Sequence, residues 1–189
     1  MVLEKNSKEI NNLINLYKSG KLIDAEKMAG DLIKKNPDSY IVYNILGIIL
    51  DSQRKYMEAL HYFHHALKIE SNYAQAENNL GVTYQKLNKL DKAIFHYKKA
   101  INIKKDFIEA LNNLGIVLKR IGQYDEAALN FKEVLKINPD HTNAKEGLGS
   151  IFLQLGKYIE GLEMISQGTG FVRFNKEKKI EIINTLNNA

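Results

Sequence analysis

The chain has 189 residues, of which 44% are hydrophobic and 26% charged, a composition that excludes wholesale disorder and fits one domain or one array of small repeats. The absence of cysteine excludes disulfides, thiolate metal sites and cysteine nucleophiles, and a net charge of +5 is too small to indicate a nucleic-acid partner. No apolar run is long enough to cross a bilayer and the first residues do not resemble a signal peptide, so we expect no membrane partner and a cytoplasmic location.

A period of 34 residues runs along the chain. A leucine–glycine pair recurs at 46–47, 80–81, 114–115 and 148–149, and alanine recurs in the same register at 25, 59, 93 and 127. Several residue series with one common spacing indicate a repeat architecture. The register predicts five repeats, at residues 6–39, 40–73, 74–107, 108–141 and 142–175.

Each repeat contains two stretches with helical periodicity, separated by a short turn such as Ile121-Gly122-Gln123. Both prolines, Pro37 and Pro139, fall at one register position, where they would stop the preceding helix. A single helix pair cannot bury its apolar face, so we expect neighbouring pairs to stack. The sequence therefore predicts an all-α array of helix pairs.

The segments AENNLGVTY at 76–84 and GQYDEA at 122–127 resemble the signature of the tetratricopeptide repeat. The resemblance covers residues 6–175 and implies a right-handed superhelical solenoid of antiparallel helix pairs. The first repeat departs from the signature at Leu13, where glycine is usual. The fifth departs in its second half, with Gly161, Ile165 and Gly168 in place of the alanine and aromatic residues of the pattern.

The tail, residues 176–189, is predicted to form a C-terminal helix. Asn175 would cap its N-terminus, and Ile180, Ile183 and Leu186 would share one face. Such a helix would cover the last repeat, because a terminal repeat needs a polar-backed cap for solubility. The alternative is that the tail links the array to a downstream domain.

The first helix of each repeat would have two faces. Counting from the first residue of each repeat, positions 4, 7, 8 and 11 gather on one side and hold core residues, whereas positions 2, 5, 6, 9, 12 and 13 gather on the other. We call this second side the inner face. The family resemblance implies that it lines a concave groove that binds peptides.

Side-chain amides and aliphatic side chains follow two tracks along the inner face. The residues predicted to contact a peptide are Asn11, Asn44, Asn78, Asn79, Asn112 and Asn113, the aliphatic Val82 and Ile116, and the basic Lys86, Lys119 and Arg120. An amide offers two donors and an acceptor, so one in each repeat could pair with the backbone of an extended peptide. The track is similar to the asparagine ladder of O-linked N-acetylglucosamine transferase, carried here by Asn11, Asn79 and Asn113. Ordinary solvated polar surface is the alternative.

No arrangement of residues predicts a catalytic, cofactor-binding or metal site. His61, His64 and His65 have a helical spacing that could hold a metal, but no acidic ligand converges on them from the sequence. We expect a non-enzymatic scaffold that binds an extended peptide or partner protein. The alternatives are a substrate-recruiting domain of a larger glycosyltransferase-like or oxygenase-like enzyme and, third, a binder of RNA or another polyanion.

Overall fold

The structure is a computed structural model that describes the backbone of residues 2–169, 172–174 and 180–182 and the side chains of residues 8–168. The chain forms two compact units, unit 1 (residues 1–105) and unit 2 (residues 106–189). The described residues hold ten helices and two short strands. None of these helices is long and apolar enough to cross a membrane.

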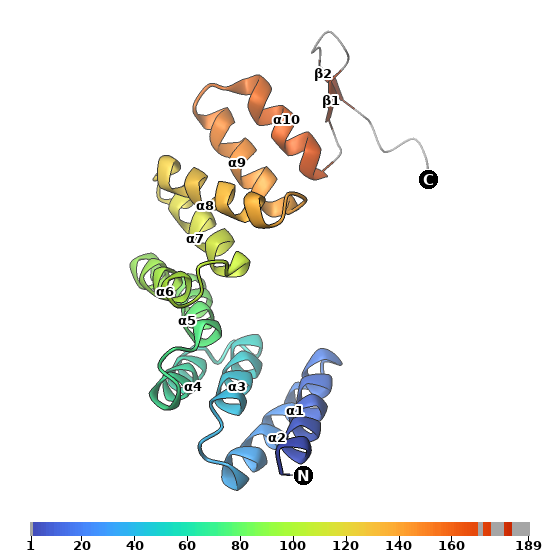
Figure 1. Ribbon diagram of the computed structural model, residues 1–189, viewed down its shortest axis with the longest axis vertical. Coiled ribbons are helices and arrows are strands. Elements are labelled where there is room, and N and C mark those ends of the chain that lie inside the picture. Colours follow the sequence, from blue (N-terminus) through green and yellow to red (C-terminus); the bar gives the residue numbers. More distant parts are fainter. Residues whose placement is uncertain (1, 170–171, 175–179, 183–189) are drawn as a thin grey trace, which may run out of the picture. The chain divides into compact units, whose positions relative to one another are not determined.

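Unit 1 consists of three antiparallel helix pairs (Figure 1). The pairs are α1 (Val2–Lys18) with α2 (Leu22–Lys35), α3 (Tyr40–Ser52) with α4 (Tyr56–Ile69), and α5 (Ala74–Lys86) with α6 (Leu90–Ile103). Neighbouring pairs pack through α2 against α3 and α4 against α5, and the first helices of successive pairs also touch. The predicted stacking of helix pairs is therefore confirmed within this unit.

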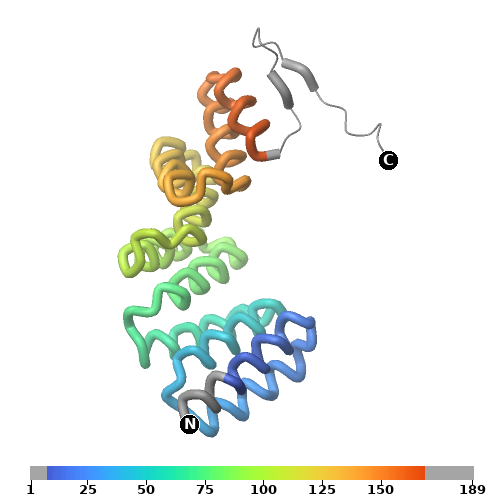
Figure 2. The backbone as a smooth tube through the Cα atoms, turned by 45° about the vertical axis from the view of Figure 1, so that its right-hand side comes forward, coloured from blue at the N-terminus to red at the C-terminus, as the bar shows by residue number. Residues whose placement is uncertain are grey.

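Unit 2 contains two further pairs, which Figure 2 shows as coiled stretches of the backbone joined by short turns. They are α7 (Ile108–Arg120) with α8 (Tyr124–Ile137) and α9 (Thr142–Gln154) with α10 (Tyr158–Thr169). The first helices from α3 onward begin at residues 40, 74, 108 and 142, and the second helices at residues 22, 56, 90, 124 and 158. Both series advance by 34 residues, as the sequence period predicts.

The turn inside each pair has one recurring backbone conformation. Register position 15 has a positive φ in all five repeats, and it is occupied by Gly20, Arg54, Asn88, Gly122 and Gly156. The next backbone N–H donates to the carbonyl five residues earlier, as in Lys21 to Leu16 at 3.0 Å. This left-handed C-terminal motif ends the first helix and reverses the chain.

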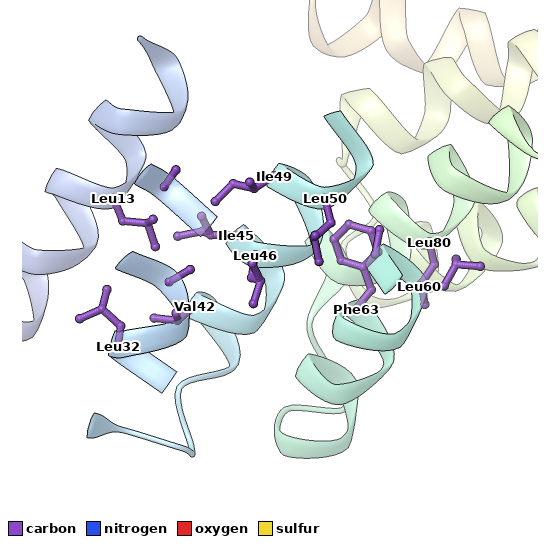
Figure 3. Close-up of a cluster of buried hydrophobic side chains, with 13 residues drawn as sticks. Leu13, Leu32, Val42, Ile45, Leu46, Ile49, Leu50, Leu60, Phe63 and Leu80 are labelled. Carbon is purple, nitrogen blue, oxygen red and sulfur yellow. The ribbon is translucent and has the colours of Figure 1, made fainter. Parts of the chain in front are cut away.

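The core of unit 1 is one cluster that runs through all three pairs, from Leu13 on α1 through Leu46 on α3 to Leu80 on α5 (Figure 3). Leu13 is completely buried, although it stands at the register position that holds glycine in the other repeats. Its counterpart on the second helix is the small Ala29, where the next repeat has Phe63. In the first repeat the large side chain of this contact is on the first helix and the small one is on the second, the reverse of the next repeat. The first repeat therefore departs from the signature and still has a filled core.

The glycine of the repeat signature allows the two helices of a pair to approach closely. A Cβ atom at Gly81 would lie 2.5 Å from the Tyr97 ring, and one at Gly115 would lie 2.8 Å from the Phe131 ring. Gly149 of the fifth repeat faces Ile165 in the same way, at 2.7 Å. An aromatic or branched side chain on the second helix thus fills the space that glycine leaves on the first.

The tail differs from the predicted C-terminal helix. Ile180–Ile182 forms β2, which pairs antiparallel with β1 (Val172–Phe174), with Arg173 opposite Glu181. Both segments alternate apolar and charged residues, a period of two that favours strands over helices. Residues 175–179 and 183–189, including the expected cap Asn175, lie outside the described residues.

Candidate binding groove

The structure divides the predicted contact residues of the inner face into two groups. The accessible group consists of side chains that are exposed or half-buried, namely Asn11, Asn79, Val82, Lys86, Asn113, Ile116, Lys119 and Arg120. They lie on α1, α5 and α7, the first helices of their pairs. These side chains reach the surface, as a binding role requires.

The asparagines at register position 5 are buried rather than open to the groove, and their role as peptide contacts stays a prediction. Asn44, Asn78 and Asn112 are 4%, 8% and 7% exposed. The amide nitrogen of Asn44 donates to the Tyr73 hydroxyl at 3.4 Å, and its oxygen accepts from the Asn79 amide at 2.9 Å. Position 5 lies at the edge of the inner face, where neighbouring side chains cover it, so the Asn44 amide pairs within the protein.

Polar contacts join the first helices of successive pairs in unit 1. Tyr17 on α1 contacts Ser52 on α3 at 3.3 Å through their hydroxyls. Asp51 on α3 is paired with Lys86 on α5 and also accepts from the Thr83 hydroxyl at 2.8 Å. Lys86, predicted as a peptide contact, therefore already neutralises a nearly buried carboxylate, and charge at this end of the inner face is balanced internally.

A pocket of about 520 Å³ lies on the inner face of unit 2. It is lined by Ile116, Lys119, Asn143, Glu146, Gly147, Ser150 and Ile165. Ile116 and Lys119 are predicted contact residues. The register places Asn143, Glu146, Gly147 and Ser150 on the same inner face, although they are not among the predicted contacts. Two of the pocket residues stand out in the sequence by their small size. Gly147 stands where the other repeats carry asparagine or isoleucine, and Ser150 stands where they carry isoleucine or valine.

A second, smaller pocket of about 280 Å³ lies between α1 and α2 in unit 1. Its lining combines acidic and basic residues with two apolar ones, namely Glu9, Asp24, Lys27, Met28, Asp31, Leu32 and Lys35. Lys35 and Glu9 form an ion pair across it at 3.2 Å. None of the predicted contact residues lines this pocket.

Unit 1 holds a buried ionic cluster that the sequence pattern does not reveal, because His96 is an isolated histidine in the sequence. The His96 Nδ1 lies 2.6 Å from the Glu77 carboxylate, which Lys99 also approaches at 3.3 Å. The Tyr84 ring stacks on His96, and the His64 ring lies 6.0 Å from it. Among the described residues no group of three or more acidic, histidine or cysteine side chains is arranged to hold a metal ion.

The pKa of Glu77 follows from opposing effects. Burial raises it, but the hydrogen bond and charge of His96, together with Lys99, outweigh burial and hold the pKa below its ordinary value. Burial also lowers the pKa of His64, and the neighbouring charge of His96 adds to this effect. The cluster therefore favours an ionised Glu77 and a neutral His64.

We expect Glu77→Gln to lower the free energy of unfolding by about 1–2 kcal/mol at pH 7, because His96 and Lys99 lose their charged partner. Since the folded pKa of Glu77 is lowered, its contribution is complete above the ordinary glutamate value of about 4.3 and is lost as the pH falls through the folded value. Urea unfolding at pH 7 and pH 3 should show the difference shrinking. Exposed Glu58→Gln is the control, and a difference that persists at pH 3 would contradict this electrostatic role.

A family model and several solved structures identify the repeat as a tetratricopeptide repeat. The tetratricopeptide repeat family model matches residues 74–107 and 108–141, two successive repeats of the predicted register. A comparison with curated protein sequences found no match.

Several solved structures share the fold. MamA is 18% identical, with 82% of this chain and 91% of that chain covered and a TM-score of 0.73. YrrB, described as a TPR protein with an unusual peptide-binding site, is 22% identical, with 89% of each chain covered and a TM-score of 0.68. PilF of Pseudomonas aeruginosa is 17% identical, with 88% of this chain and 78% of that chain covered and a TM-score of 0.81. The TM-scores show that these proteins share the fold of this chain, and at such low sequence identities the likeness is one of fold alone.

Proposed function

Because two successive repeats of this chain match the tetratricopeptide repeat family model, we propose that it binds an extended segment of a partner protein on the inner face of its first helices. The observation that carries the proposal is the pocket on α7 and α9, which combines aliphatic and polar side chains. Binding sites of this kind bury apolar groups and orient the ligand through a few polar ones. The likeness of fold to YrrB, which has a peptide-binding site of its own, supports the same proposal.

The half-buried amides of Asn79 and Asn113 support backbone recognition. Asn79 uses one donor on Asn44, and an amide carries a second donor and an acceptor that can meet a peptide N–H or C=O. Val82 and Ile116 lie one helical turn further along α5 and α7 and are half-buried, so they offer apolar surface beside these amides. The likeness to the ladder of O-linked N-acetylglucosamine transferase stays a prediction, because Asn44, Asn78 and Asn112 do not contribute to an open track.

We expect the double variant Asn79→Ala with Asn113→Ala to weaken peptide binding by about five- to hundredfold, since each lost amide pair costs on the order of 0.5–1.5 kcal/mol. Ligands would be selected from a phage-displayed library of random 12-residue peptides on the full chain, and their affinities measured by fluorescence anisotropy. The Asn79 change also removes a donor from Asn44, so circular dichroism must show that the double variant remains folded at the assay temperature.

Asn102→Ala, an exposed asparagine on the second helix α6, is the matched control and should leave the affinity unchanged. Equal affinity in the double variant and the control would contradict binding through the inner face. A steep loss of affinity with salt for labelled RNA, in place of peptide binding, would instead identify a polyanion ligand.

A further inference from the structure

The pocket of unit 2 exists because the fifth repeat has lost side-chain volume on the inner face. Register position 6 holds Asn11, Ile45, Asn79 and Asn113 in the first four repeats but Gly147 in the fifth. Position 9 holds isoleucine or valine in the first four repeats but Ser150 in the fifth. Both small residues line the pocket, together with the aliphatic side chains of Ile116 and Ile165. The hollow is thus a place where a ligand side chain can enter.

The two charged residues of the pocket differ in how they are satisfied. The Lys119 ammonium donates to the Ser150 hydroxyl at 3.4 Å. Glu146 is half-buried and makes no hydrogen bond or ion pair with any described residue. Its neighbour Lys145 is engaged elsewhere, since it pairs with Asp140 at 3.2 Å. A half-buried carboxylate without a partner favours a cation brought by the ligand.

The charge of the surrounding unit points the same way. Residues 106–169 carry six Lys and Arg against nine Asp and Glu, whereas residues 1–105 carry 17 against 11. The net positive charge of the chain is therefore not a property of the helices of unit 2. An acidic surface attracts a basic segment and raises its rate of association.

We propose that the pocket takes the side chain of a lysine or arginine from the partner's extended segment, with its methylene stem on Ile116 and Ile165 and its charged head on Glu146. Long basic side chains bury their stems on apolar surface while their heads pair with polar groups, which matches a lining of isoleucines and one carboxylate. This inference rests on the proposed function and adds to it the chemical class of the partner. Lys119 opposes the incoming charge, and it limits the affinity.

The test uses three fluorescein-labelled heptapeptides of alternating Ser and Leu whose central residue is Arg, Met or Glu. Each is titrated into the full chain, and the amide resonances of Gly147 and Ser150 are followed by NMR. We expect the Arg peptide to shift these resonances and to bind about three- to tenfold more tightly than the Met peptide, with the Glu peptide weakest. Added salt should reduce the advantage of the Arg peptide.

Three variants of the pocket test which residues cause the preference for the Arg peptide. Glu146→Gln, which breaks no bond within the described residues, should reduce the Arg peptide to the affinity of the Met peptide. Lys119→Met should strengthen binding of the Arg peptide, whereas it would weaken binding of an acidic ligand. Ser150→Ile restores the aliphatic residue of the other repeats and should block all three peptides, and Asn102→Ile, an exposed position on the second helix α6, is its control.

The outcomes separate this inference from the proposed function. Tighter binding of the Glu peptide, or an Arg peptide unaffected by Glu146→Gln, overturns the choice of a basic partner while peptide binding at the pocket stands. Equal binding of all three peptides would likewise overturn the choice of a basic partner and leave peptide binding at the pocket standing. If no peptide shifts any inner-face resonance at millimolar concentration, both the basic partner and the binding groove are wrong.

Discussion

We expect Phe131→Ala to lower the free energy of unfolding of unit 2 by about 3–5 kcal/mol. Phe131 on α8 is completely buried. Its ring fills the space beside two glycines, since a Cβ atom at Gly115 or Gly147 would lie 2.8 Å or 2.5 Å from it. Truncation would leave a cavity between α7, α8 and α9, and the rigid helix backbones beside the glycines cannot close it. Urea denaturation followed by circular dichroism at 222 nm measures the loss.

Leu129→Ala is the matched control for this variant. Leu129 lies two residues earlier on α8 and is 62% exposed, so its truncation should cost less than about 1 kcal/mol. Thermal unfolding should rank the two variants in the same order. Similar stabilities for the two variants would mean that the aromatic position does not hold the helix pairs of unit 2 together.

Gly81→Leu should destabilise unit 1 by about 3 kcal/mol or more, because the added side chain meets an interior that cannot yield. The nearest atom of Tyr97 would be 2.5 Å from the new Cβ. Tyr97 is completely buried and donates a hydrogen bond to the Gln85 side chain at 2.7 Å, so its ring cannot swing away. The variant should unfold at lower urea concentration and lower temperature than the parent chain.

Gly30→Leu provides the comparison for a helical glycine in open space. A Cβ atom at Gly30 on α2 would have no neighbour within 4 Å, and its φ is not positive. Removing this glycine from a helix should therefore stabilise the chain by up to about 1 kcal/mol. If Gly81→Leu and Gly30→Leu changed stability in the same direction, the helix register assigned to the repeats would be wrong.

Periodicity predicts the helices well because the same packing recurs in each repeat. The register of Gly81 and Gly115 places their helix pairs correctly, and even Leu13 is buried where that register puts it. The register is less informative at the edge of the inner face. A helical wheel gives the direction of a side chain but not how far its neighbours extend, so it assigns Asn44 and Asn112 to an open groove although both are buried.

Two other features lie beyond a one-dimensional pattern. Glu77 and His96 are 19 residues apart on different helices, and only the packing of α5 against α6 brings them together. In the tail, the few apolar residues fit a helical spacing, but a short segment such as Ile180–Ile182 fits a period of two equally well. The antiparallel pairing with Val172–Phe174 selects the strand.

The polar contacts between first helices have a consequence for how such an array can change in length. Tyr17 with Ser52 and Asp51 with Lys86 each join position 12 of one repeat to position 13 of the next, a separation of 35 residues. The middle helix of this series, α3, thus presents one group to the pair before it and another to the pair after it. A gene duplication that inserts a whole number of 34-residue repeats supplies both groups again, whereas a shift by a single codon would misalign them. Adding complete repeats therefore lengthens the array while each of these polar groups keeps a partner.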